Sequence, residues 1–151
     1  MIQIDGSLDF DISKIMKKKG LNENGYVQKF IDSEFLKYAS KYIPFEIGTL
    51  MHLGIVGTVV GSGSIVWLGP YARYLYYGKL AVDPKYKIGA FYNPVYGFWS
   101  RPNVSKEITD IDLNYKGAPV RGAFWGEKVK TNHSKDILEG VYKIINSTKG
   151  D

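Results

Sequence analysis

Apolar residues recur at helical spacing early in the chain. One face of the expected helix carries Val27, Ile31, Phe35, Tyr38 and Tyr42. Intervals of three and four residues place such positions on one side of a helix. We expect this helix to begin after Asn24, which can cap it, and to end at about Tyr42, because Pro44 follows. It is expected to be the main, long helix of the fold.

A second helical pattern lies near the C-terminus. Its apolar stripe consists of Ile137, Leu138, Val141, Ile144 and Ile145. Either Asn132 or Ser134 can cap this helix, and a separate short helix is expected over 124–130, with Trp125 and Val129 on one side. The stripe predicts that the last helix packs on a sheet beside the long N-terminal helix.

Strand patterns fall between and before these helices. Residues 2–10 alternate loosely, which predicts a short strand or an extended arm. Residues 50–68 are rich in Val and Ile, which favour strands, and the glycines and serines at 61–64 have the composition of a turn. We therefore expect an antiparallel β-hairpin over 50–68. A further strand is expected near 108–115.

The stretch 49–70 contains no Asp, Glu, Lys or Arg and has the length of a transmembrane helix, so a membrane span is one alternative. Its repeated glycines favour the hairpin. The N-terminus lacks a basic region followed by an apolar run, so no signal peptide is expected. We expect no membrane partner.

A short helix over 70–77 is almost entirely apolar or aromatic. Pro70 fits its first turn, and Gly78 fits just past its end. A helix this short and this aromatic needs cover on more than one side. A buried core helix is the default interpretation. The alternative is that another subunit covers part of it, since Tyr and Arg are favoured in interface cores; its candidate residues are Tyr71, Arg73, Tyr74 and Tyr77.

The stretch 79–117 lacks a regular pattern but is rich in aromatic residues. Disordered segments are poor in them, and long ordered loops are usually functional. We expect either an extended hairpin or arm that docks on a neighbouring subunit, or a loop folded back over the sheet. The candidate interface residues are Phe91, Tyr92, Tyr96, Phe98 and Trp99.

Composition adds limits to this picture. The 151 residues are expected to form one α+β domain, with an N-terminal arm and short helix over 1–23 and an inserted arm over 82–117. The net charge of +5 permits a polyanionic neighbour without requiring one. Lysines at 17–19 are expected on a solvated helix end. The chain has no cysteine, which excludes disulfides and thiol chemistry.

No catalytic or cofactor motif is present in the sequence. His52 and His133 lie in different predicted elements without the spacing of a metal site. We expect His52 to be a half-buried packing residue in a strand and His133 to be solvated beside a helix start. The chain has no Gly-x-Ser-x-Gly elbow and no phosphate-binding loop. We therefore expect no catalytic residue, metal or cofactor.

Four segments carry a resemblance when taken in order: Ile43–Leu50, Gly69–Gly78, Phe124–Lys130 and Lys135–Leu138. The chain resembles the minor capsid protein family of tailed phages of Gram-positive bacteria, which is similar to the wider group of head–tail joining, or tail completion, proteins. The resemblance spans residues 25–146. Two departures are Ile47 before Gly48 and Gly126 in place of a bulkier residue. Segment 82–117 varies among such proteins, so its role is not carried over.

The resemblance implies an α+β structural protein at the neck of the virion, made in the host cytoplasm, with no enzymatic activity. Its partners would be further copies in a ring of about six or twelve, other neck, adaptor and tail proteins, and genomic DNA in transient contact within the channel. The alternative is a small basic nucleic-acid-binding module that stacks bases on exposed Tyr and Trp. An enzyme comes third.

Overall fold

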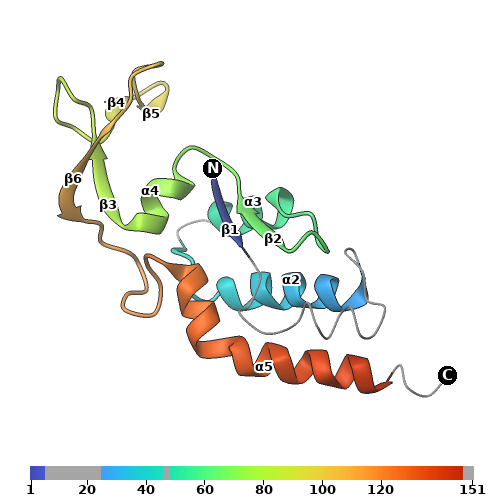
Figure 1. The fold of residues 1–151 in the computed structure, drawn as a ribbon. Coiled ribbons are helices and arrows are strands. Elements are labelled where there is room, and N and C mark those ends of the chain that lie inside the picture. Colours follow the sequence, from blue (N-terminus) through green and yellow to red (C-terminus); the bar gives the residue numbers. More distant parts are fainter. Residues whose placement is uncertain (6–24, 46–47, 148–151) are drawn as a thin grey trace.

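The computed structural model describes residues 1–5, 25–45 and 48–147, and it has the α+β architecture expected from the sequence. Figure 1 shows a body that contains the helices and an arm built from strands. The helices are α2 (Tyr26–Ala39), α3 (Thr49–Gly57), α4 (Ala72–Tyr77) and α5 (Trp125–Ser147). The strands are β1 (Ile2–Asp5), β2 (Ser64–Trp67), β3 (Lys79–Val82), β4 (Phe91–Asn93), β5 (Gly97–Trp99) and β6 (Glu107–Asp112).

Helices α2 and α5 lie along each other and form one layer of the body (Figure 1). Both predicted stripes are buried in the core they share: Val27, Ile31 and Phe35 from α2, and Ile137, Val141 and Ile145 from α5. The stripe of α5 packs on α2, whereas we expected it to pack on a sheet. Gly140 permits the close approach, since a Cβ atom there would lie 2.3 Å from the ring of Phe30.

Two predicted helix boundaries are wrong. The helix expected from Asn24 to about Tyr42 spans Tyr26–Ala39, and among the described helices the longer one is α5, with 23 residues. The segments expected as a short helix and a separate last helix form this single element. Neither Asn132 nor Ser134 caps it, because both lie in its interior, where the Ser134 hydroxyl donates to the Lys130 carbonyl one turn back. Asn24, Asp11 and the lysines at 17–19 lie outside the described residues.

The hairpin expected over 50–68 is wrong in its first half, where the chain forms α3. Strand β2 pairs instead with β1, which confirms the strand expected at the N-terminus, with Ile2 opposite Trp67 and Ile4 opposite Ile65. Two β-branched residues of this segment, Ile55 and Val56, lie on the solvent side of α3 and are 58% and 60% exposed.

Gly54 and Gly57, which precede the turn expected at 61–64, allow α3 to touch β2. A Cβ atom at Gly54 would lie 2.4 Å from Nε1 of Trp67, and one at Gly57 would lie 2.5 Å from the carbonyl oxygen of Val66. Helix and strand could not approach this closely with larger residues at these positions. The glycines therefore mark a packing contact and not a chain reversal.

We expect Gly54→Ala to destabilise the protein. At an exposed helix position, glycine to alanine raises the free energy of unfolding by up to about 1 kcal/mol. Here the added methyl group would overlap Trp67, so we expect overpacking to lower the free energy of unfolding by about 1–3 kcal/mol instead. Denaturant unfolding measures the difference. The control is Val56→Ala in the same helix, which should stay within about 0.5 kcal/mol of the parent. A Gly54→Ala protein more stable than the parent would contradict the packing.

An aromatic cluster joins the small sheet to the helices. Trp125, at the start of α5, lies edge-on to Trp67 of β2 at 5.7 Å and to Tyr76 of α4 at 4.8 Å between ring centroids. All three side chains are buried. Helix α4 ends as predicted, with Gly78 in the left-handed conformation at φ +74° and its N–H bonded to the Tyr74 carbonyl.

The arm leaves the body after α4 and returns at residue 113 (Figure 1). Strands β3 and β6 form its base as an antiparallel pair, and β4 and β5 form a hairpin at its tip. Of the two alternatives for 79–117, the extended hairpin is therefore the one observed. The strand expected near 108–115 is β6, and it pairs with β3 and not with residues 64–68. Across the described ranges, no helix combines the length and apolar character needed to cross a membrane.

Candidate interaction surfaces

The hairpin at the tip of the arm has two faces that differ in their surroundings. Phe91 lies opposite Trp99 on one face, and Tyr92 lies opposite Phe98 on the other. The chain reverses between them through Asn93, whose side-chain oxygen accepts from the N–H groups of Val95 and Tyr96. This Asx-type bonding fixes the turn.

The first face is partly covered within the arm, where Phe91 is half-buried and Trp99 is 43% exposed. The rings of Phe91 and Trp99 stack at 4.6 Å, and Tyr86 lies edge-on to Phe91 at 5.3 Å. The guanidinium of Arg101 lies over the Tyr86 ring at 5.2 Å, an arrangement that favours the cation. These contacts make the tip a packed unit with a defined shape.

An ion pair holds this unit closed at its base. Arg101 donates from Nε and Nη2 to the two carboxylate oxygens of Asp83, at 2.6 and 2.7 Å. The same carboxylate accepts from the N–H groups of Lys85 and Tyr86. Hydrogen bonds from Arg101 hold the pKa of the Asp83 carboxyl well below its usual range; burial opposes this shift, and the two backbone N–H groups support it.

We expect the arm to lose this anchor in acid. Because the pKa of Asp83 is lowered in the folded protein, its stabilising effect is fully present above the unfolded value of about 3.9 and is lost as pH falls through the folded value. Carboxyl-carbon NMR should show Asp83 titrating below about 3.9. Arg101→Gln should raise that midpoint, whereas the control Lys87→Gln, which breaks the exposed pair with Glu107, should not. An ordinary midpoint in the parent would contradict the pairing.

The second face is uncovered. We define the tip patch as Tyr92, Val95, Tyr96 and Phe98, which are 66%, 81%, 81% and 77% exposed. The surrounding segment 88–100 contains no charged residue. Contiguous exposed apolar surface of this kind marks interaction sites.

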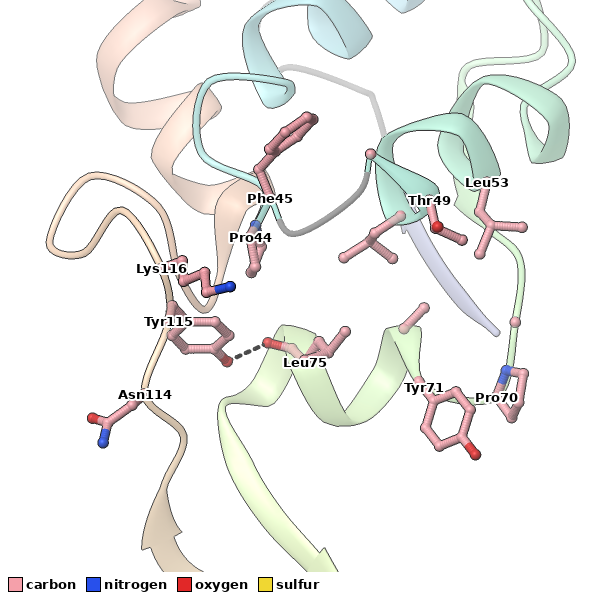
Figure 2. Close-up of a pocket in the computed structure, with 14 residues that line it drawn as sticks. Pro44, Phe45, Thr49, Leu53, Pro70, Tyr71, Leu75, Asn114, Tyr115 and Lys116 are labelled. Atoms are coloured by element: carbon pink, nitrogen blue, oxygen red, sulfur yellow. Dashed lines mark hydrogen bonds between the residues drawn. The ribbon is translucent and has the colours of Figure 1, made fainter. Parts of the chain in front are cut away.

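A concave apolar surface lies on the body. The body pocket has a volume of about 520 Å³, within the range of small-molecule sites. Figure 2 shows α3 and α4 on opposite sides of it, with segment 114–116 at one end. Its apolar lining includes Pro44, Phe45, Leu50, Leu53, Tyr71 and Leu75. The Tyr115 hydroxyl donates to the Leu75 carbonyl at 2.5 Å, which ties the root of the arm to α4.

The residues predicted from the sequence as an interface divide into separate groups. Tyr71 lines the body pocket, while Arg73 and Tyr77 line a second hollow on another side of α4. Tyr74 is half-buried. Of the arm residues, Phe91 and Trp99 belong to the covered face, and the tip patch contains Tyr92, Tyr96 and Phe98.

Sequence reasoning missed Val95 and most of the pocket wall. Val95 lies at the turn of the tip and is 81% exposed. The sequence places Phe45, Leu50 and Leu53 in or beside an expected hairpin. That they lie against α4 could therefore not be predicted. The helical spacing of Leu50, Leu53, Gly54 and Gly57 was the signal that could have found this wall.

The second hollow, about 570 Å³, is lined by Arg73, Tyr76, Glu127 and Lys130 among others. Burial, followed by the charge of Glu127, raises the pKa of Tyr76 to about 12, so this phenol stays protonated at neutral pH and is not a general base. Among the described residues, no group of three or more His, Asp or Glu side chains could hold a metal ion.

Both histidines differ from expectation. His52 lies in α3, not in a strand, and is exposed. His133 lies inside α5 and is shielded, with its ring stacked on Tyr38 at 3.9 Å and its Nε2 2.9 Å from the Tyr42 hydroxyl. It therefore joins α5 to the chain at and beyond the end of α2, which is a structural role.

These surfaces can bind another macromolecule through shape and apolar contact. Among the described residues of the tip patch and the body pocket, no nucleophile is hydrogen-bonded to a base in the arrangement that covalent catalysis requires. Comparison of the chain with protein-family models, with curated proteins and with solved structures found no match.

Proposed function

We propose that this chain is a structural subunit of the neck of a tailed phage, where copies of it form a ring that joins head to tail. The observation that carries the proposal is the presence of two unlike apolar surfaces on one subunit, the convex tip patch and the concave body pocket. The sequence resemblance supplies the class of particle.

Ring symmetry explains why two unlike surfaces are useful. In a closed ring every subunit contacts its neighbours through two different faces, one on each side. A twofold dimer instead uses one self-complementary face. An arm that projects from the body suits the ring arrangement because it can reach a neighbour (Figure 1).

The nucleic-acid-binding alternative has less support. Exposed tyrosines could stack on bases, but single-strand binders combine such rings with a positively charged groove, and the tip patch lies in an uncharged segment. A salt titration separates the two functions. A nucleic-acid binder holds an oligonucleotide with affinity that falls steeply as salt rises, whereas the connector should show weak or no binding.

Genetic disruption in the encoding phage tests the proposal. Without the protein, cells should accumulate heads and tails that fail to join, visible by electron microscopy, and the parent gene supplied in trans should restore joined particles. The control is the exposed-face variant Val56→Ala, which should complement fully. Normal numbers of joined, infectious particles without the protein would overturn the proposal.

A further inference from the structure

We infer that the tip patch of one copy inserts into the body pocket of the next copy, so that the arm is the head-to-tail connection between identical subunits. The inference adds a specific contact to the proposed function, and it rests on that function for the claim that the subunits close into a ring. The contact itself is a property of two surfaces of this chain and can be tested in the purified protein.

The tip patch is large enough to be the centre of an interface. Aromatic side chains bury about 150–250 Å² each, so the exposed fractions of Tyr92, Tyr96 and Phe98, together with Val95, correspond to roughly 500 Å² of uncovered surface. A standard protein interface buries about 800 Å² on each partner. The tip patch could therefore provide more than half of the surface that one partner buries in an interface of standard size.

The two surfaces are both mainly apolar, although Lys116 and Asn114 also line one end of the pocket (Figure 2). The tip segment 88–100 carries no charge, and the pocket wall that faces it would be formed by Pro44, Phe45, Leu50 and Leu53. An uncharged tip entering an apolar pocket avoids the desolvation cost that a charged tip would have to recover. The four side chains of the tip patch carry no charge with which to bind a phosphate, which favours a protein partner.

The arm is shaped before it binds. The stacked pair of Phe91 and Trp99 and the ion pair of Asp83 with Arg101 hold the tip from its covered side. A surface that is already ordered loses less entropy on association. The outward direction of Tyr92 and Phe98 is fixed by the same hairpin register.

The strands that carry the tip leave α4 on the side away from the pocket (Figure 2), and Nζ of Lys106 in the arm lies 5.9 Å from the centroid of the Tyr71 ring at the pocket edge. Helix α4 forms one wall of the pocket, and β3 and β6 leave on the other side of that helix (Figures 1 and 2). A contact between tip and pocket is therefore made between two chains. Because the two surfaces differ, the contact repeats head to tail and leads to a ring or an open chain of subunits.

The chain contains no cysteine, so single cysteines report contacts without background. The full-length Tyr96→Cys and Thr49→Cys proteins, with one cysteine on the tip and one at the pocket, are mixed over a range of concentrations and treated with a short bis-maleimide. We expect a mixed cross-link between the two proteins. Adding Phe98→Asp to the Tyr96→Cys chain should reduce it about tenfold or more, because central aromatic contacts dominate interface energies.

The matched control replaces the pocket cysteine with Glu139→Cys, at an exposed position of α5, and should give little product. Three results would overturn the inference: no mixed product at any concentration, a dominant Tyr96→Cys homodimer, which means tip-to-tip pairing, or equal reaction with the α5 control. Circular dichroism confirms that each variant folds. If the protein is present in virions but gives no tip–pocket cross-link, this inference is wrong and the proposed function stands. If the cross-link forms but the protein is absent from virions, the proposed function is wrong and the contact stands.

Discussion

Replacing Asp32 with alanine is expected to lower the free energy of unfolding by about 2–4 kcal/mol, because it leaves buried backbone groups without partners. Asp32 is fully buried on α2. Its Oδ2 accepts from the N–H groups of Gly61 and Gly63 at 2.7 and 3.1 Å, and its Oδ1 accepts from Nε2 of Gln28 at 2.7 Å. The carboxylate thereby fastens the loop between α3 and β2 onto α2.

The control for this prediction is Asp32→Asn. Its amide oxygen can accept from both glycine N–H groups, and Gln28 can rotate its amide to present an oxygen to the new NH₂ group. We expect the asparagine variant to lose less than half as much unfolding free energy as the alanine variant in urea. Equal losses would show that the charge and not the backbone hydrogen bonding is what matters, and no loss in either would contradict the anchor.

Trp125→Ala is expected to cost about 3–5 kcal/mol, the range for removing a large ring from a core. This residue touches both Trp67 and Tyr76, so its loss opens a cavity where the small sheet, α4 and α5 meet. Such a loss is a large fraction of the roughly 5–15 kcal/mol that holds a typical domain together. Thermal and urea unfolding monitored by far-ultraviolet circular dichroism measure it.

Trp125→Phe is the matched control. It keeps most of the ring contact and removes an indole N–H that makes no hydrogen bond in the described part of the chain, so its cost should be clearly smaller. An exposed ring provides a second comparison: Tyr96→Ala, at the tip of the arm, should leave stability nearly unchanged. If Trp125→Ala lowered the free energy of unfolding as little as Tyr96→Ala, Trp125 would not be a central residue of the core.

Local signals in the sequence predicted the helices that depend on them. Gly78 ends α4 as predicted, because a left-handed glycine acts within one or two residues, whereas the helix begins at Ala72 and leaves Pro70 outside its first turn. The stripes of α2 and α5 were recognised because burial follows the helical period. The α+β class could be predicted from these patterns, whereas the extended arm was one of two alternatives left open for 79–117.

The errors arose where a distant contact decides what a residue does. Gly54 and Gly57 lie in the segment expected to be a strand, but they belong to a helix and their role depends on β2 lying against them. Asp32 looks like a solvent-facing helix residue until the loop at 61–63 folds over it. The body pocket could not be predicted because separate segments, including 44–45, α3 and α4, converge on it.

Quantitative mass spectrometry of purified virions tests the proposed neck function most directly. The measurement is the copy number of this chain per particle, calibrated against the major capsid protein of the same particles. Our account predicts about six or twelve copies, as a closed ring at a symmetric vertex requires. A count in the hundreds would indicate a shell or tail-tube protein, and absence from the particle would contradict the neck assignment.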